Sequence, residues 1–193
     1  KTRYSRIGKY TGRIATMNLL LKKTVIEEVG GWDEKLPSQY DTDFGFRISA
    51  RGYRIAYEPS AVCYHFNRPT LHAYYRQQKQ YGKNTIKLYF KHSNLAKGDE
   101  ITDLGMNIQP ALLLAVIASF LLGILEVLRP LWYITGLLLL AMFIYYVYSA
   151  VKVSVKFHDR SALRLVVLYY VRAFAWIAGA TVTTIKYLGG REK

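Results

Sequence analysis

Hydrophobic and polar positions divide the chain into two regions of different character. Up to about residue 104, apolar side chains are interspersed with charged ones, and beyond it long apolar runs dominate. Two of these runs, residues 108–128 and 131–151, are each long enough to cross a bilayer once. A third run, residues 162–188, contains Arg172, and a charge at that depth usually faces protein or water. The pattern predicts that the first two runs are transmembrane helices rather than a buried hairpin in a soluble protein. For the third run it favours a crossing over a helix that lies partly in the membrane interface.

A short helix is predicted ahead of the acid-rich stretch of the chain. In KKTVIEEVGG, Thr24 stands three residues before Glu27, which predicts a capping box at the helix start. Gly30 and Gly31 follow and predict the helix end, because glycine commonly adopts the left-handed conformation at that position.

A second helix is predicted for DTDFGFRISARG, with Asp41 or Thr42 as its cap and the last glycine as its end. It is followed by YRIAYEPSAVCYH, in which Pro59 interrupts an alternating pattern. We interpret this stretch as two short extended segments joined by a turn, the second of which ends at His65. The fold class expected for residues 1–68 is therefore α/β.

A long helix with a basic stripe is predicted from Pro69 to about His92. Its cations recur every three or four residues and so share one face: Arg76, Lys79, Lys83, Lys87 and Lys91. Such a helix suits the membrane–water interface, where cations meet lipid phosphates and tyrosines lie at headgroup depth. A solvated surface helix is the alternative. A polar connector, SNLAKGDEITDLG, follows it.

The chain is strongly basic, with 27 lysines and arginines against 13 aspartates and glutamates and a formal net charge of +14. These cations lie in no zinc-finger, RNP or helix-turn-helix context, so they do not indicate nucleic acid as a partner. Many of them flank the apolar runs, which favours anionic membrane lipids. By the positive-inside rule, the hydrophilic region of this multi-pass membrane protein is expected on the cytosolic side.

Candidate chemistry concentrates in the turn-rich stretch GGWDEKLPSQYDTDFGFR. The sequence contains no GxxxxGK, GxGxxG, HExxH or GxSxG motif. Asp33 and Glu34 follow the double glycine beside Trp32 and are expected in a turn, whereas Asp41 and Asp43 lie at a helix start, where the dipole favours anions. Asp41 alone fits a helix cap. A carboxylate near an aromatic side chain and a mobile turn also suits a general base that removes a proton from a sugar hydroxyl.

Four stretches in a fixed order resemble a known family: TMNLLLKKTVIEEVGGWDE, YDTDFGFRISARGYRIAYEPSAVCYH, RQQKQYG and then the apolar runs. Together they resemble the C-terminal half of a membrane-bound family 2 glycosyltransferase, at residue level from Gly12 to Gly82. The resemblance implies a partial GT-A-type α/β domain, followed by an interfacial helix and two to three transmembrane α-helices. It also implies inverting transfer from a nucleotide-diphospho-sugar, with a divalent cation, Mg²⁺ or Mn²⁺, on the departing diphosphate.

The resemblance assigns roles to particular residues. Asp41 matches the aspartate of the family's Glu-Asp pair and would be the catalytic base, although Tyr40 replaces the glutamate. His65 would contact the metal or the diphosphate. The residues that would bind substrate match an aromatic–Asp–Glu turn, the helix start and a motif similar to QxxRW: Trp32, Asp33, Glu34, Asp43, Gln77, Gln78, Lys79 and Tyr81.

Three parts are expected: an acceptor-side half of a GT-A domain (1–68), an interfacial basic helix with its connector (69–104) and a transmembrane region (105–193). The metal-binding DxD of the family would then lie upstream of Lys1, and this chain alone is expected to be inactive. The expected reaction is transfer to a lipid-linked or glycan acceptor at the cytosolic membrane face. The alternative is a non-enzymatic membrane transporter or accessory subunit with a cytosolic α/β cap.

Overall fold

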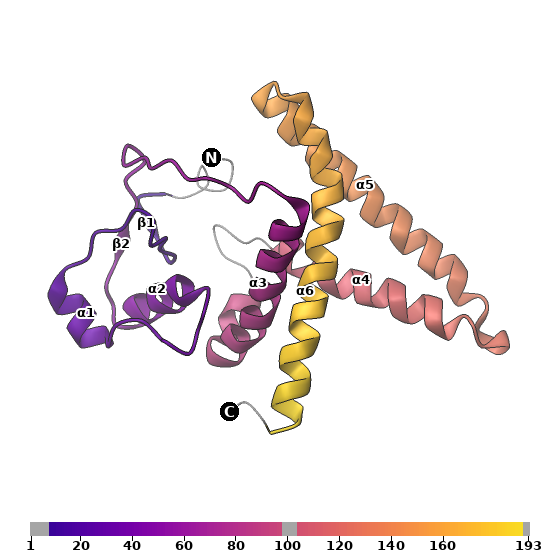
Figure 1. Cartoon of the computed structure of the whole chain (residues 1–193), viewed down its shortest axis with the longest axis horizontal. Helices are drawn as coiled ribbons and strands as arrows, with labels where there is room; N and C mark the ends of the chain where they lie inside the picture. Colours follow the sequence, from indigo (N-terminus) through magenta and orange to yellow (C-terminus); the bar gives the residue numbers. More distant parts are fainter. Residues whose placement is uncertain (1–7, 98–103, 191–193) are drawn as a thin grey trace.

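A computed structural model describes residues 8–97 and 104–190 of the chain. Its helices and strands are, in chain order, β1 (Tyr10–Thr11), α1 (Lys23–Val29), α2 (Tyr40–Ala50), β2 (Ile55–Ala56), α3 (Leu71–Lys91), α4 (Leu104–Leu122), α5 (Leu131–Phe157) and α6 (Leu165–Leu188). Figure 1 shows the short elements β1, α1, α2 and β2 on one side and the hairpin of α4 and α5 on the other. The long helices α3 and α6 pack against each other between these two parts.

The short elements enclose a small apolar core. Val25 and Val29 of α1 pack against Phe44 and Ile48 of α2, and Ile14 completes the cluster. The spacing of four residues on each helix places both members of a pair on one face. Phe44 and Ile48 are 0% and 2% exposed, so this face of α2 forms the centre of the core.

Helix α1 ends where the double glycine predicts. Gly30 and Gly31 have φ values of 87° and 68°, in the left-handed region that glycine adopts without a steric penalty. The predicted capping box, however, is wrong. The N-cap is Lys22 and makes no side-chain cap bond, and Thr24 lies inside the helix, too late in the chain to cap it.

Helix α2 begins at an unusual backbone position. Its N-cap is Gln39, whose φ of 61° places a side-chain-bearing residue in the left-handed region. The predicted caps, Asp41 and Thr42, lie inside the first turn because the helix begins before them, so that prediction is also wrong. The Asp41 carboxylate instead accepts a hydrogen bond from the Thr42 N–H at 2.8 Å.

The predicted extended segments are reduced to one short pairing. Strand β2 lies antiparallel to β1, with Tyr10 opposite Ala56 and Thr11 opposite Ile55. The second predicted segment forms no strand, since residues 61–69 are exposed and irregular and therefore have no buried face to pack. The described chain is mostly helical with a small two-stranded sheet. The predicted α/β class is therefore represented only by this sheet and the short helices beside it.

Helices α3 and α6 pack closely because each has a glycine at the contact. A Cβ on Gly82 of α3 would lie 2.4 Å from the Trp176 carbonyl oxygen. A Cβ on Gly179 of α6 would lie 2.1 Å from the Lys79 carbonyl oxygen, where ordinary contact is 3.4–4 Å. Small residues of this kind let helix backbones approach each other and are typical of helix contacts in membranes.

The cations of the predicted basic stripe do not share one environment. Lys79 and Lys83 are half-buried beside α6, where the Lys83 carbonyl accepts a hydrogen bond from the Thr183 hydroxyl at 3.1 Å. Arg76 is exposed, whereas Lys91 pairs with two acids at the other end of the helix. Helix α3 is thus tied to protein on more than one side, and its location at the membrane surface stays a prediction.

Within residues 8–97 and 104–190, three helical segments are long and apolar enough to cross a membrane: Gly105–Leu122, Leu131–Phe157 and Arg160–Leu188. The third predicted crossing is therefore supported by its length and composition. No membrane side is assigned by this finding, so the cytosolic location of the hydrophilic region stays a prediction.

The first of these segments is shorter than the predicted run of residues 108–128, because α4 ends at Leu122. The ring of Trp132 occupies the space beside Gly123, where a Cβ would lie 2.3 Å from the Trp132 Cδ1 atom. Trp132 Nε1 also donates to the Phe120 carbonyl at 3.2 Å. A side chain of α5 thus satisfies one of the last carbonyls of α4, which would otherwise lack a partner within the helix.

The candidate membrane spans enclose a polar and aromatic core. Tyr146 of α5 is 0% exposed and stacks edge-on against Tyr170 of α6, with ring centroids 4.7 Å apart. Arg172 is 6% exposed, donates a hydrogen bond to Gln109 of α4 and lies 5.2 Å from the centre of the Tyr169 ring. The charge of Arg172 therefore faces protein, as expected for an arginine within a span.

Candidate active site

The start of α2, which carries Asp41, is fixed to α3 by side-chain hydrogen bonds. Asn84 of α3 is buried, and its Nδ2 donates to the Ser38 carbonyl at 2.9 Å and to the Ser38 hydroxyl at 2.6 Å. One residue later, Gln39 Nε2 donates to Thr85 Oγ1 at 3.1 Å. These bonds hold the left-handed backbone of Gln39 in place. Helix α3 therefore determines where α2 begins.

Asp41 and Tyr81 come together across this contact. The Asp41 side chain is partly exposed, and Tyr81 is partly buried on α3. Burial raises the pKa of the Tyr81 phenol, and the nearby charge of Asp41 raises it further. The charges of Arg68 and Arg13 and a hydrogen bond with Gln77 act in the opposite direction without cancelling this effect. Tyr81 therefore remains neutral at physiological pH and can donate a hydrogen bond beside a candidate base.

Two guanidinium groups lie near Asp41 and Tyr81. Arg13 Nη2 donates to the Thr42 hydroxyl at 2.8 Å, one residue after Asp41. Arg68, in the segment that leads into α3, is exposed, and its charge acts on Tyr81. The site combines a carboxylate, a neutral phenol and two cations. Chemically, such a set can accept a proton and bind an anionic group.

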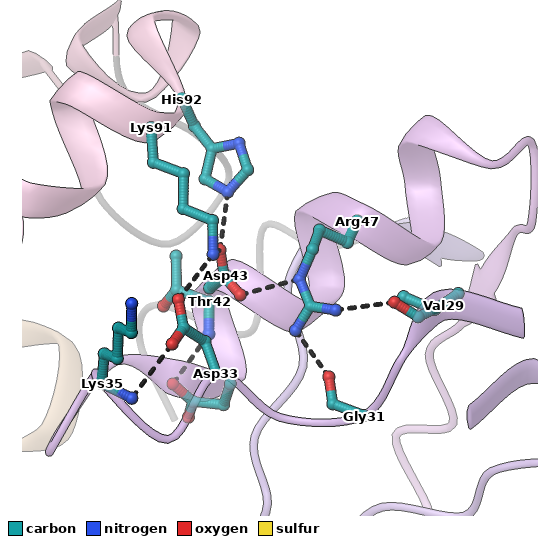
Figure 2. Close-up of polar contacts among 10 residues, drawn as sticks. Val29, Gly31, Asp33, Lys35, Thr42, Asp43, Arg47, Lys91 and His92 are labelled. Carbon is teal, nitrogen blue, oxygen red and sulfur yellow. Dashed lines mark hydrogen bonds and ion pairs between the residues drawn. The ribbon is translucent and has the colours of Figure 1, made fainter. Parts of the chain in front are cut away.

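Asp43, two residues after Asp41, has a different role. Its carboxylate is 0% exposed and forms ion pairs with Arg47 Nε at 2.8 Å and Lys91 Nζ at 2.7 Å, and a hydrogen bond with His92 Nε2 at 2.8 Å. Figure 2 shows Asp43 between Arg47 on one side and Lys91 and His92 on the other. We expected Asp43 to bind substrate, but its carboxylate is buried and held by these three partners, so a substrate cannot reach it. It anchors α2 to the end of α3.

Lys91 extends this network to the turn that follows the double glycine. Its Nζ lies 2.7 Å from Asp33 Oδ2 and also 2.7 Å from Asp43 Oδ1. Asp33 Oδ1 accepts a hydrogen bond from the Lys35 N–H at 3.0 Å, which closes the turn. A single lysine at the end of α3 therefore holds both the turn and α2, as Figure 2 shows.

The network keeps its charged groups ionised. Hydrogen bonding to Lys91 lowers the pKa of Asp33 by more than partial burial raises it. Burial raises the pKa of Asp43, but the hydrogen bonds from Lys91, His92 and Arg47 outweigh it and hold the pKa below its ordinary value. Burial lowers the pKa of Lys91, and its two carboxylate partners raise it by more. Each charge thus stabilises its neighbours at neutral pH.

Arg47 fixes the double-glycine turn from the other side. Its Nη1 donates to the Val29 carbonyl at 2.8 Å, and its Nη2 donates to the Gly31 carbonyl at 2.6 Å (Figure 2). The last carbonyls of a helix lack partners within it, and here the guanidinium supplies them. Trp32 then packs on Phe44, with ring centroids 4.4 Å apart. Both hydrogen bonds and aromatic packing hold the turn on α2.

The turn borders a surface pocket of about 740 Å³, a size typical of small-molecule sites. Trp32, Asp33 and Glu34 line this pocket together with Tyr40, the residue before Asp41. Glu34 is exposed, and Trp32 is 40% exposed. The turn residues that were predicted to bind substrate therefore lie together at a pocket, and Tyr40 connects them to the start of α2.

The residues of the motif similar to QxxRW face different sides of α3. Gln77 forms a hydrogen bond with Tyr81, beside the candidate base. Gln78 is buried and accepts a hydrogen bond from Trp176 Nε1 of α6 at 3.0 Å, and Lys79 is half-buried along the same helix. We expected Gln78 to bind substrate, but its side chain bonds α3 to α6. The Lys79 carbonyl faces Gly179 of α6, and substrate binding by the Lys79 side chain stays a prediction. Consecutive residues of a helix point in different directions, so the motif could not present all its members to one site.

His65 lies in the exposed, irregular segment 61–69, and not at the end of a strand as predicted. In the part of the chain that the structure describes, no group of three or more His, Cys, Asp or Glu side chains is placed to hold a metal ion. Two of the candidate acids already pair with Lys91. The described residues therefore do not fit a site for Mg²⁺ or Mn²⁺ on their own.

Sequence analysis missed the residues that hold the site together. Asn84, Thr85 and His92 belong to no motif, and Lys91 had the same spacing as the other cations of the stripe. Asparagine and threonine are poor helix formers. Their place in the middle of α3 was the one signal that these side chains have a specific partner.

Comparison with known proteins places the chain among enzymes of sugar transfer. The family described as "Glycosyl transferase family group 2" matches residues 3–187. The probable glycosyltransferase YdaM of Bacillus subtilis (strain 168) is 28% identical over 82 residues, which are 41% of this chain and 19% of that protein. The pre-mycofactocin glycosyltransferase of Mycobacterium tuberculosis (strain ATCC 25618 / H37Rv) is 31% identical over 74 residues, 38% of this chain and 16% of that protein.

A third relative is the poly-beta-1,6-N-acetyl-D-glucosamine synthase of Staphylococcus aureus (strain COL). It is 33% identical over 64 residues, which are 33% of this chain and 15% of that protein. The chain thus matches less than a fifth of the length of each of these three relatives. No solved structure matches the chain.

Proposed function

Because the chain belongs to glycosyl transferase family group 2, we propose that the protein transfers a sugar from a nucleotide-diphospho-sugar to an acceptor, with inversion at the anomeric carbon. We place the reaction at the cytosolic membrane face and assign the elements from β1 to β2 to the acceptor-side half of a GT-A-type domain. The family match runs through the candidate membrane spans as well as the short elements. It does not support a non-enzymatic transporter or accessory subunit.

The contrast between Asp41 and Asp43 carries the assignment of the general base. The Asp43 carboxylate is buried and held by Arg47, Lys91 and His92, so it cannot reach an acceptor. Asp41 is partly exposed, and among the described residues no cation pairs with it. A base must lie within hydrogen-bond reach of the proton that it removes. Of the two carboxylates at the start of α2, Asp41 is the one that meets this condition.

In the proposed reaction, an oxygen of the acceptor, from a hydroxyl or from a protonated phosphate, attacks the anomeric carbon as its proton moves to the Asp41 carboxylate. The bond between that carbon and the diphosphate oxygen breaks, and the nucleoside diphosphate leaves with the electron pair. The neutral Tyr81 phenol donates a hydrogen bond to the acceptor or to Asp41. Arg13 and Arg68 bind anionic groups of the substrates. The Trp32–Glu34 turn, held by Lys91 and Arg47, borders the sugar.

A divalent cation would neutralise charge on the departing diphosphate when bound, as the family relationship implies. The described residues do not form its ligand set, so the steps above depend on protein side chains alone. His65, in its exposed segment, is positioned to offer at most a single ligand to a site built mainly from other groups.

Product analysis of the full-length protein in detergent tests this proposal. A panel of nucleotide-sugars is supplied with membrane lipid extract and with soluble glycans, and the products are separated and their anomeric configuration is read by NMR. We expect one donor to be consumed with inverted configuration, and Asp41→Asn to lower product formation by about 10² or more. Asp159→Asn makes the same chemical change at an exposed site before α6 and should leave the product unchanged. The proposal would be contradicted if the product kept the anomeric configuration of the donor, or if no donor in the panel were consumed.

A further inference from the structure

A second cavity, of about 430 Å³, lies where α3 meets the candidate spans α4 and α6. All three helices contribute apolar side chains to its wall: Ile86 and Tyr89 of α3, Ala111 and Leu114 of α4, and Ile177 and Ile185 of α6. Figure 1 shows α4 running away from α6 near the place where α3 packs on α6. The residues that line the cavity come from these three helices. It is separate from the pocket at Trp32, because the two share no lining residue.

The surroundings of this cavity indicate the chemistry of its occupant. Two of its three walls, α4 and α6, are long and apolar enough to cross a membrane. Leu114 and Ile185 are 50% and 64% exposed, so the wall continues onto the outer surface of these spans. In a membrane, that surface meets hydrocarbon chains. An apolar cavity offers water few hydrogen-bond partners, whereas a hydrocarbon chain needs none.

Helix α3 connects this cavity to the candidate base. Thr85 lines the cavity, and its hydroxyl accepts a hydrogen bond from Gln39, which lies two residues before Asp41. Trp176, which also lines the cavity, donates a hydrogen bond to Gln78 one turn earlier on α3. Thr85 thus connects the cavity wall to the start of α2, and an occupant of the cavity would have to extend along α3 to bring its headgroup to Asp41.

The charges beside Asp41 indicate the headgroup. Arg13 is held near the base by its hydrogen bond to Thr42, and the charge of Arg68 acts on the same phenol. Guanidinium groups form strong, directed hydrogen bonds with phosphate oxygens. The site therefore offers an apolar cavity for a chain at one end and two guanidinium groups for an anion at the other.

We propose that this cavity binds the hydrocarbon chain of the acceptor, a lipid that carries a phosphate in its headgroup. The inference rests on the proposed sugar transfer and specifies its acceptor class. A bilayer surrounds the chain with equally apolar material, so the chain alone gives little selectivity. The contacts between phosphate and arginine must provide it. A lipid phosphate should therefore bind better than an alcohol with the same chain, and better than inorganic phosphate.

Photolabelling of the full-length protein in detergent micelles tests the inference without requiring sugar transfer. The probe is farnesyl phosphate with a diazirine on its chain, and labelled peptides are identified by mass spectrometry. We expect labelling to concentrate on the cavity walls, around Ala111 and Ile185. Unlabelled farnesyl phosphate should displace the probe, whereas farnesol and inorganic phosphate at the same concentration should not.

A matched pair of variants tests the location of the chain. Ala111→Phe fills the cavity and should lower labelling at least about tenfold, because an added ring excludes the chain. Ala118→Phe adds the same bulk to an exposed position of α4 outside the cavity wall and should leave labelling unchanged. Thermal unfolding verifies that both variants are folded. If Ala111→Phe does not fold, the map of labelled peptides on the unmodified protein decides the question.

Two results would overturn the inference: labelling spread evenly over α5 and the cavity walls, or equal displacement of the probe by a diacylglycerol, which has no phosphate. Either would mean that the cavity takes any bilayer chain. Saturable labelling without sugar transfer would retain the lipid site and remove the proposed function. Sugar transfer to a soluble glycan without labelling would remove the lipid site and leave the proposed function standing.

Discussion

Replacing Gly179 with alanine tests whether the contact between α3 and α6 sets the geometry of the site. An added Cβ would lie 2.1 Å from the Lys79 carbonyl oxygen, and ordinary contact begins at 3.4 Å. The obstructing atom belongs to the backbone, so it cannot rotate away as a side chain would. The two helices must therefore separate locally by roughly 1.3 Å, which is the difference between these distances.

The expected cost follows from two opposing contributions. Forcing extra atoms into a packed contact costs about 1–3 kcal/mol, and replacing glycine by alanine inside a helix stabilises it by about 1 kcal/mol. Gly136 of α5 provides the matched control, because a Cβ there would meet nothing within 4 Å. Gly136→Ala gains the same helix propensity without the clash. The free energy of unfolding of Gly179→Ala should be lower than that of Gly136→Ala by about 1–3 kcal/mol.

Thermal unfolding in detergent micelles, followed by tryptophan fluorescence, measures this difference. At roughly 2–4 °C per kcal/mol for a chain of this size, the midpoint should differ by about 2–12 °C. Sugar transfer should also fall, because α3 carries Tyr81 and a displacement of about 1 Å can cost roughly 10²-fold in rate. Equal midpoints and equal transfer in the two variants would refute the argument that this contact positions the site.

The network around Asp43 and the phenol of Tyr81 allow three further tests. Lys91→Ala should raise the KM for the acceptor more than it lowers kcat, and should lower the free energy of unfolding by about 1 kcal/mol through loss of two ion pairs. Lys35→Ala, at an exposed position, is the control and should change neither the KM nor the free energy of unfolding. Equal effects of the two substitutions would contradict the role of Lys91. The pKa of Asp43 lies below its ordinary value of 3.8, so its stabilising contribution is complete above that value and is lost as the pH falls through the folded-state pKa. Thermal midpoints should therefore drop below about pH 4, and Asp43→Asn should flatten this dependence; an unchanged slope would show that other groups cause it. Tyr81→Phe should lower kcat about tenfold, which corresponds to the free energy of one hydrogen bond, and should leave the thermal midpoint unchanged. An unchanged kcat would show that the Tyr81 hydroxyl does not act on the reacting groups.

Local structure was predictable where one residue type decides it. The double glycine ends α1 because glycine adopts positive φ at no steric cost, and the apolar runs form helices because a bilayer crossing needs about 20 apolar residues. The same reasoning failed at the starts of α1 and α2. There Thr24 and Asp41 fit the composition of a cap, but both helices begin earlier in the chain. For α2, Asn84 donates a hydrogen bond to the Ser38 carbonyl, and Gln39 donates one to the Thr85 hydroxyl.

The long-range pairs of the site were not predictable from spacing. A lysine every third or fourth residue of α3 is compatible with lipid phosphates, with water and with carboxylates from another part of the chain. Only the fold brings Lys91 to Asp33 and Asp43. Asp41 could be singled out through the resemblance to a family motif, whereas the burial of its neighbour Asp43 required the arrangement of α2 on α3 to be known.

The central claim is that two aspartates, two residues apart on α2, have separate roles: Asp41 reacts and Asp43 supports. The most direct measurement compares Asp41→Asn with Asp43→Asn in the full-length protein, recording turnover, donor affinity and thermal unfolding for each. We expect Asp41→Asn to lower turnover by about 10² or more with donor affinity and thermal midpoint unchanged. We expect Asp43→Asn to lower the thermal midpoint, because Arg47 and Lys91 lose their buried anionic partner. Near-normal turnover in Asp41→Asn, at an unchanged thermal midpoint, would contradict the assignment of the base.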